Sequence, residues 1–336
     1  MVTIVDVAKE ANVSTATVSR VLNGSDAVTD EMKRRVADAI EKVGYQIPNR
    51  LRNVRQSVEI GGNHIREGEK SLLLVICNEF QTAILHSFQR TAGEKGYSVA
   101  VAYYADNSDL PQLARLIDSF SPILAGIALI RCTDNSHEFQ QLVGSYPLVQ
   151  VGEAMMDNHL NRVVYNDEIK MGRDATDYLV SCGCRHIGIL IGDSGVSSSP
   201  FYRQNRLNGY FLSLLSHQIP VDQSLVQKVN LSTDGGYEGC KLLLERHPDM
   251  DAVIGVTGAV AQGALYAVRH SENSSQDIVV FSMDSNGAWD LERTRYPYIN
   301  THPEEMGSAA AHVLHAAICG DLERDYSVII RHTLYH

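Results

Sequence analysis

Hydrophobic residues near the start of the chain recur at the spacing of short amphipathic helices. The inward positions of a first helix are spaced i, i+3, i+4, i+7: Ile4, Val7, Ala8 and Ala11. After the break at residues 12–13, Ser14 can cap a second helix. Thr29 can cap a third, whose predicted inward face is Met32, Val36, Ala39, Ile40 and Val43. Two short helices joined by a tight turn and packed on a third predict a helix-turn-helix module.

From residue 70 onward, short apolar runs alternate with amphipathic stretches of helical length. The runs that predict buried strands are 72–77, 98–104, 123–130, 148–151, 187–191, 252–256 and 278–283. The stretches that predict helices include 84–95, 110–120, 171–181 and 236–246. Such alternation implies parallel sheets with right-handed crossovers, and its length suits two doubly wound halves. Ligands of such folds bind at the carboxyl ends of the strands, so we expect a small molecule in a cleft between the halves.

Charge is divided unequally along the chain. The whole sequence carries −11, which taken alone would point away from nucleic acid. Residues 1–60 carry +1, however, and the remainder carries −12, so the two parts are expected to have different partners. The longest apolar runs are strand-sized and the start lacks the pattern of a secretion signal. We therefore expect a cytoplasmic protein with no membrane segment.

Motifs for catalysis and metal binding are missing from the sequence. The six cysteines do not form a disulfide framework, and the Cys182-x-Cys184 spacing has no second pair to complete a zinc site. His312 and His315 are spaced i, i+3 but have no third ligand in view. We expect no cofactor, no metal and no enzymatic activity.

The second predicted helix has an exposed face without acidic residues. That face consists of Thr15, Ala16, Thr17, Ser19, Arg20 and Asn23. Short polar side chains near a helix N-terminus allow close entry into a major groove, and an arginine can pair with a guanine edge or a phosphate. A merely solvated face normally mixes Glu and Lys, and both are absent from residues 14–23. The pattern favours DNA binding.

The chain here resembles the headpiece of the lac repressor (LacI/GalR) family of bacterial transcription regulators. The resemblance covers residues 5–23, Val-Asp-Val-Ala-Lys-Glu-Ala-Asn-Val-Ser-Thr-Ala-Thr-Val-Ser-Arg-Val-Leu-Asn. It implies base contacts by Thr15, Ala16 and Arg20. It implies phosphate contacts by Ser14, Thr17, Ser19, Asn23, Thr29 and Tyr45. The implied partners are double-stranded operator DNA and a second copy of the chain, because a dimer doubles the contacts on a pseudo-palindrome.

Residues 44–56 are similar to the hinge helix of this family, which inserts an apolar side chain into the minor groove. Counting from Tyr45 places Val54 at the inserted position, and counting from Pro48 places Arg55 there. We prefer Val54, because a guanidinium cannot replace an apolar wedge between bases. An arginine-rich linker without a wedge remains an alternative. Residues 58–70 contain glycines and are longer than the usual connection, which predicts a flexible linker.

The resemblance extends to an effector domain similar to periplasmic sugar-binding proteins. It implies that Arg206 and Asp284 hydrogen-bond a polar ligand such as a carbohydrate or related metabolite, with a structural salt bridge as the alternative for each. Further positions expected near the ligand are Asn78, Phe80, Leu231 and Thr257. Leu231 replaces a frequent aromatic residue and Thr257-Gly258 a frequent Asn-Asp. With fewer acceptors and aromatics, the pocket is expected to favour a phosphorylated, acidic or smaller ligand.

The expected architecture is an all-α helix-turn-helix headpiece with a hinge helix (1–57), a linker (58–70) and an α/β periplasmic-binding-protein-like effector domain (71–336). Its N-subdomain is expected at about 71–162 and 291–320, and its C-subdomain at about 163–290 and 321–336. The expected function is a dimeric, effector-controlled transcriptional repressor. A transport-type binding protein or a cleft enzyme without a DNA role are the alternatives, but the first would carry a secretion signal and no headpiece, and the second a catalytic constellation.

Overall fold

Two units follow one another along the chain, residues 1–69 and residues 70–336. The computed structural model describes residues 4–15, 17–18, 29–43, 71–78, 81–132, 134, 136–152, 162–192, 200–271, 278–284, 296–323 and 325–336. Among these residues, no helix has the length and apolar character needed to cross a membrane.

The first unit contains α1 (Ile4–Ala11) and α3 (Asp30–Val43) packed around a small core. The buried members of that core are Val7, Ala8, Ala11, Val18, Val36 and Ala39. Asn12 has a φ of 52°, the left-handed conformation that a sharp turn after α1 requires. The Arg35 guanidinium donates to the Ala11 carbonyl at 2.8 Å and so ties α3 to the end of α1. The predicted inward positions Val7, Ala8, Ala11, Val36 and Ala39 are buried, and Val43 packs against them. Met32, predicted to face inward, is instead 40% exposed in the first turn of α3. The side chains of Ile4 and Ile40 lie outside the described part of the structure.

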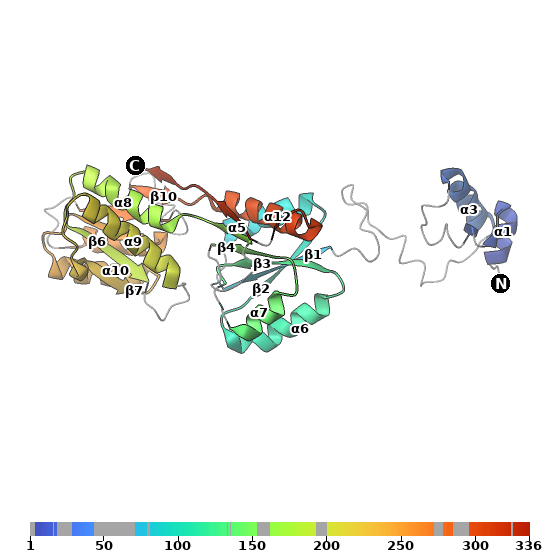
Figure 1. Cartoon of the computed structure of the whole chain (residues 1–336), viewed down its shortest axis with the longest axis horizontal. Helices are drawn as coiled ribbons and strands as arrows, with labels where there is room; N and C mark the ends of the chain where they lie inside the picture. Colours follow the sequence, from blue (N-terminus) through green and yellow to red (C-terminus); the bar gives the residue numbers. More distant parts are fainter. Residues whose placement is uncertain are drawn as a thin grey trace. The chain divides into compact units, whose positions relative to one another are not determined.

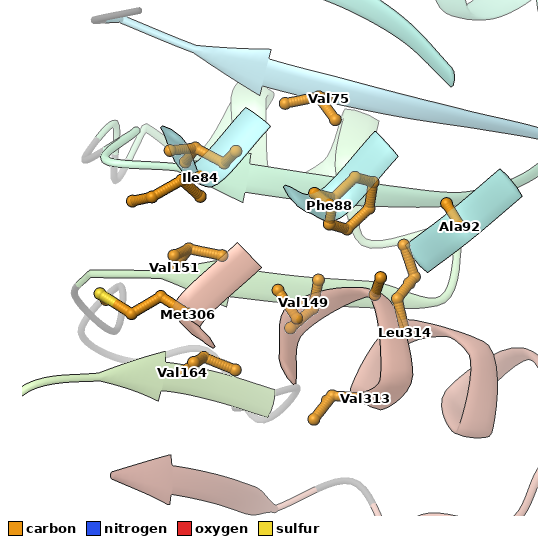
Figure 2. Close-up of a cluster of buried hydrophobic side chains, with 14 of the residues drawn as sticks. Val75, Ile84, Phe88, Ala92, Val149, Val151, Val164, Met306, Val313 and Leu314 are labelled. Carbon is orange, nitrogen blue, oxygen red and sulfur yellow. The ribbon is translucent and has the colours of Figure 1, made fainter. Parts of the chain in front are cut away.

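In the second unit, a first sheet of six parallel strands has the order β11-β5-β4-β3-β1-β2. Its strands are β1 (Leu72–Cys77), β2 (Ser98–Tyr103), β3 (Leu124–Ile130), β4 (Leu148–Val151), β5 (Arg162–Tyr165) and β11 (Tyr326–Ile329). The helices α5 (Thr82–Glu94) and α12 (Pro303–Cys319) cover one face, and α6 (Leu110–Phe120) and α7 (His137–Val143) the other (Figure 1). Figure 2 shows Phe88 of α5 and Leu314 of α12 lying between their helices and the strands.

A second sheet has the order β12-β10-β9-β8-β6-β7, with only β12 antiparallel among the pairings described. Its strands are β6 (Ile187–Gly192), β7 (Val226–Val229), β8 (Ala252–Gly255), β9 (Val279–Ser282), β10 (Tyr298–Asn300) and β12 (Thr333–Tyr335). Helices α8 (Glu168–Ser181) and α9 (Pro200–Ser216) pack together, as do α10 (Thr233–Arg246) and α11 (Gly258–Arg269). The seven predicted strands and four predicted helices are confirmed, with ends that shift by up to three residues.

The chain passes between the two sheets three times, and this changes the predicted subdomain boundaries at 163, 291 and 321. Strand β5 pairs with β4 and so belongs to the first sheet, whereas β10 pairs with β9 in the second. The C-terminal region, predicted as part of the C-subdomain, forms two strands, β11 in the first sheet and β12 in the second. Each crossing occurs just after a strand. The sequence pattern there shows that the strand ends, but it does not show with which sheet the strand pairs.

One buried amide ties these three crossings together. Asn166, which follows β5, donates through Nδ2 to the carbonyl of Thr301 at 3.1 Å and to the carbonyl of Ile330 at 2.8 Å. Thr301 follows β10 and Ile330 follows β11, so each acceptor lies on another crossing. An amide can donate twice, whereas a carboxylate at this position could only accept.

Replacing Asn166 with Ala is therefore expected to destabilise the second unit by about 1–3 kcal/mol, since two buried carbonyls lose their donor. Replacing it with Asp should cost more, because a carboxylate would face two carbonyl oxygens. Chemical unfolding followed by circular dichroism measures both. Asn208→Ala is the control, because the hydrogen bond that Asn208 accepts from Gln204 is exposed and lies within one helix. Equal losses for positions 166 and 208 would contradict the role of Asn166.

Candidate functional site

The start of the second helix is built by Ser14 in the way the sequence predicts. The Ser14 hydroxyl accepts from the backbone N–H of Thr17 at 3.1 Å and pairs with the Thr17 hydroxyl at 2.8 Å. Ser14 and Thr15 are exposed and Thr17 is half-buried. Exposed hydroxyls at a helix N-terminus, where backbone N–H groups point outward, suit contact with phosphate. Thr29 is also exposed, and its hydroxyl accepts from the Met32 N–H at 3.4 Å at the start of α3.

Several predicted DNA contacts lie outside the described residues. These are Ala16, Ser19, Arg20, Asn23 and Tyr45 of the headpiece, together with Val54 and Arg55 of the predicted hinge helix. Their roles remain predictions.

The carboxyl ends of the second sheet bring together three of the expected effector residues. Leu231 follows β7, Thr257 follows β8 and Asp284 follows β9. Asp284 is buried, and its carbonyl accepts from the Ser282 hydroxyl at 2.5 Å. The Thr257 hydroxyl accepts from the Val260 N–H at 3.3 Å and caps α11. Leu231 packs against both hydrophobic clusters of the sheet and so contributes apolar packing.

Arg206 of α9 is held by groups of the protein itself. Its Nε donates to Oε2 of Glu168 at 2.6 Å, and its Nη1 donates to the carbonyl of Val256. The side chain of Arg206 is 0% exposed and that of Glu168 8%. The structural salt bridge that the sequence left open for Arg206 is present.

Close helix packing produces this ion pair. A Cβ added to Gly172 of α8 would lie 2.2 Å from the carbonyl oxygen of Arg206, and one added to Gly209 of α9 would lie 2.1 Å from that of Ile169. The two backbones therefore touch where both residues are glycine. Glu168 lies one turn before Gly172 and Arg206 nearly one turn before Gly209, so the crossing aligns their side chains.

A separate cavity of about 210 Å³ lies at the carboxyl ends of β1, β2 and β3. It is lined by Asn78, Tyr104, Ala105, Asp106, Asn107, Cys132 and Asp134. The Tyr104 hydroxyl donates to Asp134 and to Oδ1 of Asn107, the latter at 3.0 Å. Burial, and then the hydrogen bond to Asp134, raises the pKa of Tyr104. Burial also raises the pKa of the Cys132 thiol to about 12, so both groups stay neutral at pH 7.

Asn78 lines this polar cavity, whereas Phe80 is outside the described residues, and a role of either in effector binding stays a prediction. The other polar lining residues were not predicted from the sequence: Tyr104, Asp106, Asn107 and Asp134. Their position in the sequence could have indicated them, because they lie at or shortly after the ends of the buried runs that form β2 and β3. Across the described part of the chain, no group of three or more His, Cys, Asp or Glu side chains is placed to hold a metal ion.

Comparison with known proteins identifies both units. Residues 3–49 match the family model described as bacterial regulatory proteins, lacI family. Residues 77–336 match the model described as periplasmic binding proteins and sugar binding domain of LacI family. The chain belongs to the lacI family of bacterial regulatory proteins. It is accordingly a DNA-binding transcriptional regulator with a periplasmic-binding-protein-like effector domain.

Relatives within the lacI family span the full chain at modest identity. The HTH-type transcriptional regulator MalR of Streptococcus pneumoniae is 25% identical over 100% of this chain and 98% of its own length. The ribose operon repressor of Haemophilus influenzae is 26% identical over 94% of this chain and 91% of its own. Both are described as regulators of transcription.

Solved structures support the same fold. A complex of the transcriptional regulator CelR with cellobiose has a TM-score of 0.69 at 24% identity and covers 100% of this chain and 99% of its own. A lac repressor dimer bound to operator and an anti-inducer also has a TM-score of 0.69, at 20% identity, and covers 100% of this chain and 98% of its own. The headpiece-plus-effector architecture predicted from the sequence is confirmed.

Proposed function

We propose that this lacI-family protein is a repressor that binds a pseudo-palindromic operator as a homodimer. A small polar metabolite, bound where the strands of residues 70–336 end, controls its affinity for the operator. The observation that carries the proposal is a headpiece with a serine-capped second helix joined in one chain to two doubly wound sheets with polar carboxyl ends. The hinge helix within residues 1–57 and the linker 58–70 belong to this proposal.

The DNA-binding surface follows from the second helix. We assign base contacts to Thr15, Ala16 and Arg20, and phosphate contacts to Ser14, Thr17, Ser19, Asn23, Thr29 and Tyr45. Phosphate contacts fix the register, and base contacts supply the specificity. Val54 or Arg55 of the hinge helix enters the minor groove, with Val54 preferred as the apolar wedge.

A face of the first sheet supports the dimer. Strand β2 is an edge strand, and its Val101 and Tyr103 are 47% and 55% exposed. In the sheet register they pair with Val75 and Cys77, which are buried in the core beneath α5 and α12. The apolar core face therefore continues past the helices to the surface, and covering it with a second copy would remove it from water.

The effector residues remain those at the strand ends. We assign Arg206, Asp284, Asn78, Phe80, Leu231 and Thr257 to the site or its immediate support. Two similar proteins carry a sugar in their names, a ribose operon repressor and a regulator in complex with cellobiose, and this supports a carbohydrate or related metabolite.

Selection from a random duplex library by the full chain tests the proposal. A regulator of this kind enriches a two-fold-symmetric sequence whose half-sites are recognised equally. Enrichment of a single asymmetric element would contradict the dimer, and failure to enrich any sequence would remove sequence-specific binding.

Arg20→Ala is expected to relax specificity at one position of each half-site, with a loss of discrimination of about 1–3 kcal/mol. The reason is that one bidentate contact to a base edge disappears while phosphate contacts remain. Competition gel shifts with every base at each half-site position measure this. A uniform loss across all sequences would assign Arg20 to phosphate, and Thr29→Ala serves as the comparison expected to show such a uniform loss.

Val101→Asp is expected to weaken dimerisation about 100-fold or more, because a charge would be buried in an apolar interface without a partner. Sedimentation equilibrium measures the dissociation constant. Ile329→Asp is the matched control, since Ile329 is 52% exposed on β11, the opposite edge of the same sheet. If position 329 proves the more sensitive one, the interface lies at the other edge.

A further inference from the structure

We propose that Glu168 is a specificity-determining residue that keeps anionic metabolites out of the effector site, so that the site accepts neutral or cationic molecules. This rests on the proposed function, which places a small molecule at the ends of these strands. It replaces the expectation from the sequence of a phosphorylated or acidic ligand.

Arg206 is a cation at the carboxyl ends of the second sheet, and its side chain could bind an anion through two N–H donors. A guanidinium binds carboxylate or phosphate through a fork of parallel N–H donors. In this protein Glu168 takes the Nε donor at 2.6 Å, and the Val256 carbonyl takes a donor of Nη1. Both side chains are buried, so the carboxylate of the protein takes the Nε donor, which a ligand's carboxylate or phosphate would otherwise use.

The charge of this pair also sums to zero. Glu168 contributes −1 and Arg206 +1, and both lie in a region of low dielectric where their mutual attraction is strong. A bound anion would have to displace Glu168 and leave a second carboxylate nearby. A neutral hydroxyl compound needs no such displacement.

Helix N-termini are the other place where the fold could bind an anion, because their free backbone N–H groups attract negative charge. At three helices that follow strands, a side chain of the protein already uses one of these N–H groups. The Asp167 side chain accepts from Lys170 N–H at the start of α8, Ser232 from Gly235 N–H at the start of α10, and Thr257 from Val260 N–H at the start of α11. Their hydrogen-bond distances are 2.9, 3.0 and 3.3 Å.

The described lining of the cavity at the first sheet carries negative charge. Its described lining includes the carboxylates of Asp106 and Asp134 and no Lys or Arg. Asp106 accepts from the Ser108 N–H at 2.8 Å, and this hydrogen bonding, led by the Ser108 side chain, lowers the pKa of Asp106, so it is ionised at neutral pH. Among the described residues, this cavity and the Glu168–Arg206 pair therefore present carboxylates or a neutralised cation to a ligand.

The test uses the full chain and inorganic phosphate as the probe. In wild type, calorimetric titration at matched ionic strength should show no saturable phosphate binding. Glu168→Gln keeps the shape of the side chain but removes its charge and should bind phosphate at least tenfold more tightly than wild type. The double variant Glu168→Gln/Arg206→Gln should lose that gain. Wild-type binding as tight as that of the variant would overturn the proposal, and so would a variant that gains no affinity.

A second variant covers the case in which Glu168→Gln fails to fold. Glu168→Ala leaves space beside Arg206, and acetate should restore its thermal stability while chloride at equal ionic strength should not. Absence of this rescue would also overturn the proposal. Operator binding by each variant, measured without metabolite, distinguishes this proposal from the proposed function. A gain in phosphate affinity without operator binding keeps the role of Glu168 and rejects the proposed function. Operator binding without a gain in phosphate affinity rejects the role of Glu168 and keeps the proposed function.

Discussion

Replacing Arg206 with Met is expected to destabilise the effector domain by about 3–5 kcal/mol. The loss arises because Glu168 would stay buried as a carboxylate without its cation, since both side chains lie inside the protein. The Val256 carbonyl would lose a donor as well. Urea unfolding followed by circular dichroism measures the change. This is the largest single effect that the structure predicts for a polar residue of the candidate site.

A double variant shows whether the destabilisation comes from a buried carboxylate left without its cation. Arg206→Met/Glu168→Leu should recover most of the stability, because apolar side chains of similar volume often replace a buried pair at little cost. Arg173→Met is the surface control, because Arg173 and Asp177 form an exposed i, i+4 pair at 3.5 Å that is worth less than about 1 kcal/mol. A double variant no more stable than the single one would show that packing, and not charge, dominates at Arg206.

Gly209→Ala is expected to cost about 3 kcal/mol, near the upper end of the usual cost of overpacking. The added methyl group would lie 2.1 Å from the carbonyl oxygen of Ile169 and 2.7 Å from the backbone N of Arg173. Neither backbone atom can move without separating α8 from α9. Because the same crossing aligns Glu168 with Arg206, the substitution should also lengthen their ion pair.

The matched control for this prediction is Gly93→Ala in α5. A Cβ at Gly93 would meet nothing within 4 Å, and alanine is favoured over glycine in a helix by roughly 0.5–1 kcal/mol. Thermal unfolding of the two variants should shift in opposite directions. If both variants were equally stable, the close approach of α8 and α9 would not exist in solution.

Buried parallel strands were the part of the fold that the sequence predicted best. Runs such as 72–77 and 148–151 are apolar at nearly every position because both faces of the sheet are covered, and their observed ends agree with the prediction. Strand β7 was missed because it is an edge strand whose sequence includes the exposed Lys228. Strand β10 has three residues, too few to form a pattern.

The candidate site was predictable in its position but not in its contacts. Placement of Thr257 and Asp284 at strand ends follows from the alternation of strands and helices. The partner of Arg206 could not be predicted, because Glu168 lies 38 residues away and the two meet through a crossing of glycines. Similarly, the bonds from Asn166 to Thr301 and Ile330 depend on where three distant crossings converge.

The central claim is that a metabolite bound by residues 70–336 and an operator bound by the headpiece change each other's affinity. The most direct measurement is the anisotropy of a labelled, library-selected operator titrated with the full chain, with and without a saturating metabolite known to bind the effector unit. The proposed function predicts a change of roughly 5–150-fold, with an equal factor when metabolite affinity is measured with and without operator. A metabolite that binds the protein but leaves operator affinity unchanged would contradict it.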